Sequence, residues 1–155
     1  MPLIDGKPLI KPPRLAIITS RFNERITQAL YQGAMQRAQE QGISSDLLTS
    51  VWVPGAVELP LVAQRLARTG RYDALVLLGA VIRGETTHYD YVCQQVSQGC
   101  LQVALSHDLP VVFGVLTTEN GEQAEERAGG KRGNKGADAI DTALHMISVL
   151  QQLST

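Results

Sequence analysis

The stretch DALVLLGAVI, residues 73–82, is apolar or glycine at every position after its aspartate. A short and nearly continuous apolar run is typical of a strand that is buried on both faces, and such strands occur in parallel sheets covered by helices. Directly after it the sequence becomes polar, from Arg83 to His88. We therefore expect a central strand at 73–82 and a polar loop at its carboxyl end.

Strand and helix patterns alternate on both sides of this stretch. Short apolar runs predict further strands at 14–20, 46–53 and 111–118. Apolar residues at helical spacing predict helices at 26–42, 56–70, 89–107 and 136–153. This order predicts a single-domain three-layer α/β/α fold, with an open, mainly parallel four-stranded sheet and helices on both faces. No linker or repeat interrupts the pattern, so we expect an N-terminal segment, 1–13, and one domain, 14–155.

The composition is that of a globular protein without an excess of positive charge. Of 155 residues, 44% are apolar and 19% are charged, and the formal net charge is −1, so neither nucleic acid nor a membrane is an expected partner. No apolar run approaches the roughly 18 residues of a membrane span, and the first residues lack the apolar stretch of a signal peptide. We therefore expect a cytoplasmic protein. Cys93 and Cys100 lie too far apart on one predicted helix to pair, and no spacing predicts a metal site.

Polar residues follow each of the four predicted strands, at 20–23, 54–58, 84–88 and 117–120. Because ligands bind beyond the carboxyl ends of parallel strands, four such loops predict one side of a binding crevice. Any one loop taken alone is also explained by ordinary turn and helix-cap chemistry. Their joint placement is what favours a site.

The third of these loops, Gly84–His88, has the composition of a phosphate site. Gly84 allows close approach of the backbone, Thr86 and Thr87 supply hydroxyls, and the amides at a helix start bind anions. His88, at the edge of the loop, is the residue type best suited to proton transfer near neutral pH. The pattern supports equally well a simpler interpretation, in which Thr87 only caps a helix and His88 is a surface residue.

A glycine-rich stretch, AGGKRGNKG at 128–136, does not fit a nucleotide P-loop. Asn-Lys-Gly stands where Gly-Lys-Ser/Thr is required, and no strand precedes it. Its three basic residues fit a solvated loop equally well. Arg127, directly before it, is a better phosphate candidate, because a guanidinium can clamp two oxygens. The four lysines lie near the amino terminus or in this stretch, and none has the buried setting that suits an enzyme-bound Schiff base.

Several of these motifs, in this order and spacing, resemble the 6,7-dimethyl-8-ribityllumazine synthase family of riboflavin biosynthesis. The resemblance covers nearly the whole chain and is carried by Phe22-Asn23, PGAVELP (54–60), GAVIRGETTHYDYVC (79–93), PVVFGVLTT (110–118), QAEERAG (123–129) and GNKG (133–136). It implies a flavodoxin-like fold and a transferase that uses no cofactor. The implied reaction condenses 5-amino-6-(D-ribitylamino)uracil with 3,4-dihydroxy-2-butanone 4-phosphate to 6,7-dimethyl-8-ribityllumazine, releasing phosphate and water.

The resemblance also implies roles for single residues. Phe22 would stack on the pyrimidine, and His88 would be the general acid and base. Pyrimidine and ribityl binding is implied for Phe22, Asn23, Ala56, Val57, Glu58, Val81, Ile82, Phe113 and Lys135, the last two reaching in from a neighbouring subunit. Phosphate binding is implied for Gly84, Glu85, Thr86, Thr87 and Arg127.

Sites shared between subunits imply a homo-oligomer. The family is built on pentamers, and some members assemble twelve pentamers into an icosahedral shell; association with riboflavin synthase is also implied. The compact turn GGKRGNKG favours the shell, although Gly130 and Arg132 stand where other shell formers often carry Thr and Ala.

Two other classes of function stay open at this point. A flavodoxin-like flavin-binding protein would use the same sheet order and a phosphate loop, but residues 21–23 do not form the Ser/Thr-rich loop expected after its first strand. A non-catalytic shell or scaffold protein would keep the fold without the chemistry, although Glu58, His88, Arg127 and Lys135 are all present. Tightly bound flavin mononucleotide would favour the first class, and turnover equal to the uncatalysed rate would favour the second.

Overall fold

Four parallel strands form the centre of the fold. The computed structural model describes residues 1–154, and its sheet has the order β2-β1-β3-β4, with each neighbouring pair parallel. The strands are β1 Leu15–Ser20, β2 Leu48–Val53, β3 Ala74–Ile82 and β4 Val111–Thr118. All four coincide with the strands that the sequence predicts, to within two residues at each end.

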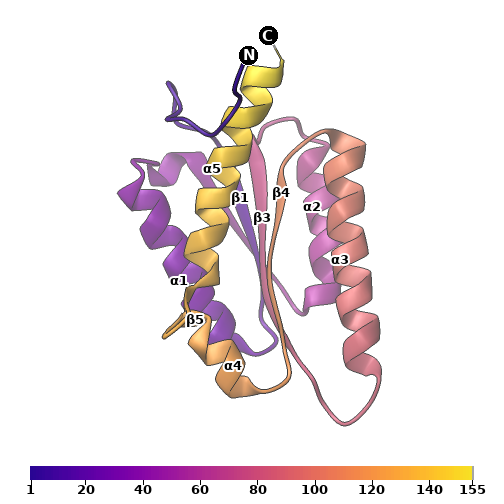
Figure 1. Ribbon diagram of the computed structural model, residues 1–155. Helices are drawn as coiled ribbons and strands as arrows, with labels where there is room; N and C mark the ends of the chain where they lie inside the picture. The colour runs from indigo at the N-terminus through magenta and orange to yellow at the C-terminus, as the bar shows by residue number, and fades with distance from the viewer. Residues whose placement is uncertain (155) are drawn as a thin grey trace.

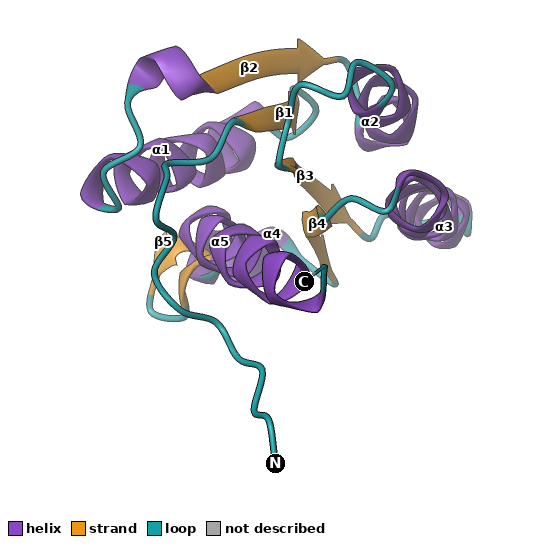
Figure 2. Ribbon diagram, turned by 90° about the horizontal axis from the view of Figure 1, so that it is seen from above, coloured by secondary structure: helices purple, strands orange, loops and turns teal. Residues whose placement is uncertain are grey.

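Helices cover both faces of this sheet, as Figures 1 and 2 show. One face packs against α1 Glu24–Glu40 and α5 Lys135–Leu153, and the other against α2 Leu59–Ala67 and α3 His88–His107. A short helix, α4 Gly121–Glu126, follows β4. The predicted three-layer α/β/α fold is therefore confirmed.

The central strand β3 accounts for the apolar run that predicts it. Val76 and Leu78 belong to the core beneath α1 and α5, while Leu75 and Leu77 belong to the core beneath α2 and α3. None of the four side chains has any exposed surface, and burying each one is worth roughly 1.5–3 kcal/mol. Because both faces are covered, neither set of alternate positions favours polar side chains.

Local turns and a small hairpin are the main differences from the prediction. The strand predicted from residue 46 begins at Leu48, because Ser45–Leu47 form a 3-10 turn. A second 3-10 turn, Ala56–Glu58, precedes α2. The glycine-rich stretch, predicted as a loop, forms an antiparallel hairpin of β5 Ala128–Gly130 and β6 Gly133–Asn134.

The N-terminal residues 1–14 carry neither helix nor strand. They lie against α5, where the Lys7 amide donates to Ser148 Oγ at 3.0 Å and His145 Nε2 lies 3.4 Å from Asp5 Oδ1. Figure 1 shows the N-terminus and the end of α5 at the same end of the molecule, opposite the carboxyl ends of the strands. The division between residues 13 and 14 stays a prediction. Within residues 1–154, no helix combines the length and the apolar character needed to cross a membrane.

Candidate functional site

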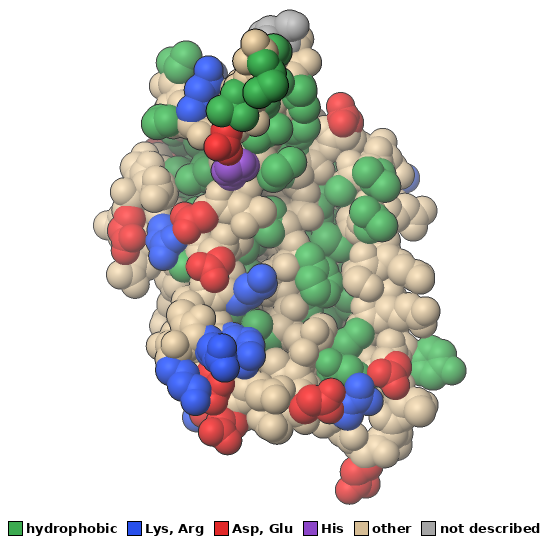
Figure 3. All heavy atoms as spheres, viewed as in Figure 1, with side chains coloured by type: hydrophobic (Ala, Val, Ile, Leu, Met, Phe, Trp, Pro, Cys, Tyr) green, Lys and Arg blue, Asp and Glu red, His purple; other side chains and the backbone are tan. Residues whose placement is uncertain are grey.

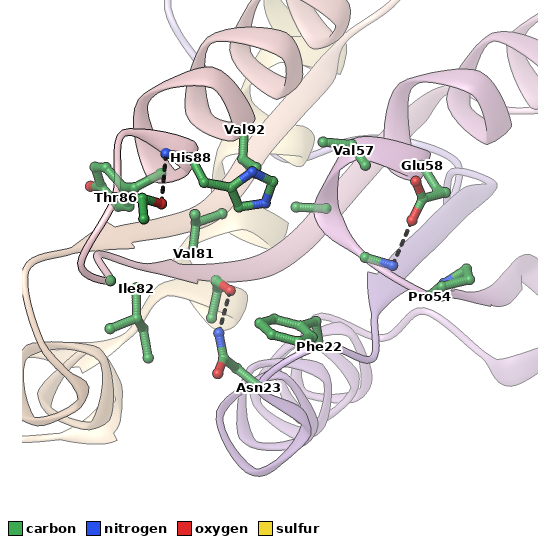
Figure 4. Close-up of a pocket in the computed structure, with 15 residues that line it drawn as sticks. Phe22, Asn23, Pro54, Val57, Glu58, Val81, Ile82, Thr86, His88 and Val92 are labelled. Atoms are coloured by element: carbon green, nitrogen blue, oxygen red, sulfur yellow. Dashed lines mark hydrogen bonds between the residues drawn. The ribbon is translucent and has the colours of Figure 1, made fainter.

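A cavity of about 440 Å³ lies at the carboxyl ends of β1, β2 and β3 (Figure 4). Its walls come from the loop after β1, the turn after β2, the end of β3 and the start of α3. Ten of the predicted site residues line it: Phe22, Asn23, Ala56, Val57, Glu58, Val81, Ile82, Gly84, Thr86 and His88. Glu85 and Thr87 belong to the same loop as Gly84 and Thr86 but do not line the cavity. The four-loop crevice expected from the sequence is thus a cavity built from three of the loops.

Asn23 holds the first loop against the central strand. Its backbone is left-handed, with φ 63°, a conformation that asparagine tolerates better than most residues. Its side-chain Nδ2 donates to the Ala80 carbonyl at 2.8 Å. The preceding Phe22 amide donates to the Pro54 carbonyl at 3.0 Å, so the loop is also tied to the turn after β2. Phe22 is 72% exposed, and its ring lies at the cavity wall (Figure 4).

The turn after β2 is closed by Glu58. Its Oε1 accepts a hydrogen bond from the Gly55 amide at 2.9 Å, while the Glu58 amide donates to the Gly55 carbonyl at 3.2 Å. These reciprocal bonds close the 3-10 turn Ala56–Glu58, which leads into α2. A carboxylate can accept further hydrogen bonds after one such bond. Glu58 can therefore stabilise its own turn and still accept hydrogen bonds from the hydroxyl groups of a ligand.

The loop Gly84–Thr87 joins β3 to α3 and brings His88 to the cavity. Thr86 Oγ1 accepts from the His88 amide at 3.3 Å, whereas Thr87, at the N-cap position, makes no capping bond with its side chain. Thr87 therefore occupies the cap position that the simpler interpretation gives it, but its side chain makes no capping bond. His88 is exposed, as the simpler interpretation expects, but Figure 4 shows its imidazole and the Phe22 ring on two sides of the same cavity.

Arg83, directly before this loop, contacts both α3 and the segment after β4. Its Nε lies 2.8 Å from Glu119 Oε2, after β4, and its Nη2 lies 3.4 Å from Asp90 Oδ1 in the first turn of α3. Its guanidinium also lies 4.3 Å from the centroid of the Tyr89 ring. Tyr89 lines the cavity, and burial, followed by the neighbouring Cys93, raises the pKa of its phenol. Arg83 and Tyr89 are absent from the site that the sequence predicts.

One more residue could have been found from the sequence. Val92 lies one helical turn after His88 and lines the cavity with it, as an i, i+4 pair on one helix face should. Tyr89 follows His88 directly, but its place depends on the Arg83 contact, which no local pattern shows.

Three predicted residues lie elsewhere, in a second cavity of about 620 Å³. Phe113, Arg127 and Lys135 line it, together with Arg132. The Lys135 amide donates to the Arg127 carbonyl at 2.8 Å, and Arg127 Nη1 donates to the Gln123 carbonyl at 2.9 Å. Figure 3 shows Lys and Arg side chains gathered at the lower left of this face, over α4 and the hairpin. One chain therefore does not bring Arg127 to the loop Gly84–Thr87.

The first cavity has the chemistry of a site for a small organic molecule. Its walls are mainly apolar, from Val57, Val81, Ile82 and Val92, and a few polar groups converge on it from Asn23, Glu58, Thr86 and His88. Apolar walls with few oriented polar groups are typical of ligand sites. The fold and this cavity define an α/β protein with a cavity of small-molecule type at the carboxyl ends of parallel strands, lined on one side by a histidine.

Comparison with known proteins identifies the family. The sequence profile described as 6,7-dimethyl-8-ribityllumazine synthase matches residues 12–151. The chain is 56% identical to the 6,7-dimethyl-8-ribityllumazine synthase of Coxiella burnetii (strain RSA 493 / Nine Mile phase I) over 140 residues, which cover 90% of this chain and 93% of the relative. It is 50% identical to the enzyme of the same name from Protochlamydia amoebophila (strain UWE25) over 149 residues, 96% of this chain and 87% of the relative.

The chain belongs to the 6,7-dimethyl-8-ribityllumazine synthase family, a family of transferases in riboflavin biosynthesis. The resemblance drawn from the sequence motifs is therefore confirmed. These similarities support the synthase class and give no support to a flavin-binding or scaffold protein.

Proposed function

We propose that the chain condenses 5-amino-6-(D-ribitylamino)uracil with 3,4-dihydroxy-2-butanone 4-phosphate to 6,7-dimethyl-8-ribityllumazine, releasing phosphate and water. The observation that carries the proposal is the first cavity, in which ten residues of the predicted site converge in a chain of this family. The cavity volume of about 440 Å³ is in the range of small-molecule sites.

The pyrimidine lies against Phe22 in this proposal. The exposed Phe22 ring offers a stacking face, and the apolar end of β3, Val81 and Ile82, supports the opposite side of the ligand. Asn23, Ala56 and Val57 hold the ring edge together with these residues. Glu58, whose carboxylate has capacity beyond its bond to Gly55, accepts from ribityl hydroxyls.

The chemistry consists of proton transfers and the loss of phosphate. An amine attacks a ketone and water leaves, so a proton must move to and from the reacting atoms, and His88 serves as general acid and base. The phosphate group lies at Gly84, Glu85, Thr86 and Thr87, where backbone amides near the start of α3 stabilise the leaving anion. Holding both substrates side by side supplies much of the rate. No step in this scheme needs a cofactor or a metal.

We also propose that each site is completed by a neighbouring subunit. Phe113, Arg127 and Lys135 are needed by the scheme but line the second cavity of their own chain. A heterologous interface that places the second cavity of one subunit against the first cavity of the next generates a ring. Exposed apolar side chains on α2 and α3, at Leu61, Leu101 and Leu105, support burial in such an assembly.

The ring proposed is a pentamer, and twelve pentamers form an icosahedral shell that associates with riboflavin synthase in the cytoplasm. The support for this larger assembly is the family membership and the compact hairpin of residues 128–134.

The reaction is tested by mixing the purified protein with both substrates and following the lumazine absorbance or fluorescence. The substrates condense slowly without enzyme, so the uncatalysed mixture is the control. We expect a rate that rises in proportion to protein concentration and lies well above the control. A rate equal to the control, from folded and assembled protein, would return the scaffold class to first place.

A further inference from the structure

One side chain, Asn134, joins three elements around the second cavity. Its Oδ1 accepts from the Gly136 amide at 2.8 Å and from the Ala137 amide at 3.2 Å, which caps the start of α5. Its Nδ2 donates to the Ala29 carbonyl of α1 at 3.0 Å. Asn134 is itself the last residue of the hairpin, paired with Ala128. The amide therefore links the hairpin, α1 and α5.

Two glycines provide the space for this arrangement. A Cβ atom at Gly33 of α1 would lie 2.3 Å from both Cγ and Nδ2 of Asn134, and a Cβ atom at Gly136 would lie 2.0 Å from the Leu30 carbonyl oxygen. Both distances are far below contact. The backbones of α1 and α5 approach closely here only because neither position carries a side chain, and the Asn134 amide fills the space between them.

Arg127 and Lys135 are both connected to Asn134 through the backbone. Lys135 follows Asn134 in sequence and is the first residue of α5, and its amide donates to the Arg127 carbonyl at 2.8 Å. Ala128, next to Arg127, pairs with Asn134. Two of the three cationic side chains that line the second cavity, Arg127 and Lys135, therefore leave the backbone next to the Ala128–Asn134 pair.

We propose that Asn134 is a positioning residue that sets the direction of Arg127 and Lys135 toward the neighbouring subunit's substrates. The inference rests on the proposed function, in which Arg127 holds the phosphate and Lys135 the ribityl chain. The helix cap and the bond to Ala29 have separable effects: the cap starts α5, and the bond to Ala29 fixes where that start lies relative to α1.

The experiment separates these two effects with Asn134→Asp and Asn134→Ser. Both replacements keep an acceptor for the helix cap, and both lose the donor to Ala29. We expect a KM for the phosphate-bearing substrate about tenfold higher, with kcat close to that of the unchanged protein, because binding groups move while His88 does not. In an Arg127→Ala background, Asn134→Asp should add much less to this KM, since the group it positions is gone.

Gly33→Ala tests the same idea from α1 without changing Asn134. Its new Cβ would displace the Asn134 amide, so we expect a similar rise in KM. Gln32→Ala, at an exposed neighbouring position on the same helix, is the matched control and should leave KM unchanged.

The outcomes are distinct. Folded and assembled variants at positions 134 and 33 with unchanged KM would overturn the inference, as would equal effects of Asn134→Asp with and without Arg127. Loss of helix content or of assembly in both Asn134→Asp and Asn134→Ser would assign Asn134 to folding instead and overturn it as well. An unchanged protein that turns over no faster than the uncatalysed mixture would overturn the proposed function itself.

Discussion

His88 and His107 stand at opposite ends of α3, about 30 Å apart along the helix axis. Only His88 lines the first cavity. Because general acid–base catalysis contributes roughly 10²–10⁴-fold, we expect His88→Ala to lower kcat by at least about 10²-fold with no change in assembly. His107→Ala, the control, should leave turnover unchanged. Steady-state kinetics with size-exclusion chromatography checks this, and equal rates for both variants would remove His88 from its role.

Thr19 and Thr27 provide a second test at single positions. Both are fully buried, but Thr19 Oγ1 has no hydrogen-bond partner within residues 1–154, whereas Thr27 Oγ1 donates to the Glu24 carbonyl at 3.3 Å. A buried polar atom without a partner costs roughly 1–3 kcal/mol. We therefore expect Thr19→Val to raise the free energy of unfolding by about 1 kcal/mol, and Thr27→Val to lower it.

Urea unfolding at a fixed protein concentration measures both changes, because assembly makes apparent stability depend on concentration. Equal destabilisation by the two substitutions would show that the Thr19 hydroxyl is satisfied after all.

For single residues, the sequence predicts which loops carry the site better than it predicts which side chains contact one another there. Residues such as Asn23, Glu58 and His88 follow strand ends, so their place at one edge of the sheet follows from topology. Arg83 is different: its contacts with Glu119 and Asp90 join the segment after β4 to the first turn of α3. Only the folded chain brings those carboxylates together, which is why neither Arg83 nor Tyr89 is predicted.

The four strands of the main sheet were predictable because each shows an apolar run in the sequence. β3 and β4 match the predicted ranges closely because their residues face covered sheet surfaces along most of their length. The hairpin was not predictable, because β5 has three residues and β6 has two, too few for any alternation to show. Its geometry depends instead on distant partners, such as the Ala29 carbonyl that holds Asn134.

The packing of α3 on β4 leads to a pH prediction through Cys100. Cys93 and Cys100 are both unpaired, as predicted, and Cys100 is buried, with its thiol donating to the Val111 carbonyl at 3.4 Å. Burial raises the pKa of this thiol from an ordinary value near 9 to about 11. Between these values the unfolded chain loses the proton while the folded chain keeps it, so the free energy of unfolding falls as pH rises.

The expected loss from Cys100 is on the order of 2 kcal/mol, complete by about pH 11, with none below about pH 9. Cys100→Ala should start less stable at pH 8 but lose less stability up to pH 11. Ser97→Ala, on the same helix, should keep the original slope of the free energy of unfolding against pH. The slope does not vanish in Cys100→Ala, because burial also raises the pKa of Tyr89 and of Cys93. Identical slopes for all three proteins would contradict the assignment to Cys100.

At the scale of the whole molecule, most of the predicted site residues are divided between two cavities. His88 and Phe22 line the first cavity, while Phe113, Arg127 and Lys135 line the second. Sequence motifs show that a chain carries all the residues of a site, but they do not show whether one chain brings them together. For Arg127 the sequence motifs left that choice open, and in the fold Arg127 lines a different cavity from His88, which agrees with the proposal that a neighbouring subunit supplies it.

Mixing two defective variants tests this arrangement. His88→Ala damages the first cavity of its own chain, and Arg127→Ala damages the second. Suppose that each site takes His88 from one subunit and Arg127 from the next. In a ring assembled from equal amounts of the two variants, a site is then intact where an Arg127→Ala subunit supplies His88 and its neighbour, a His88→Ala subunit, supplies Arg127. Random assembly places that pair at about one quarter of the interfaces.

We therefore expect unfolding and co-refolding of the mixture to restore about one quarter of the unchanged activity, while each variant refolded alone stays defective. Simple mixing without unfolding is the control and should restore nothing as long as subunits do not exchange. If both residues acted within one chain, every site in the mixed ring would carry one defect, because each chain lacks either His88 or Arg127. Activity that stays at the level of the single variants after co-refolding, in rings shown to contain both chains, would place the whole site within one subunit and require Arg127 to reach the first cavity by a change of conformation.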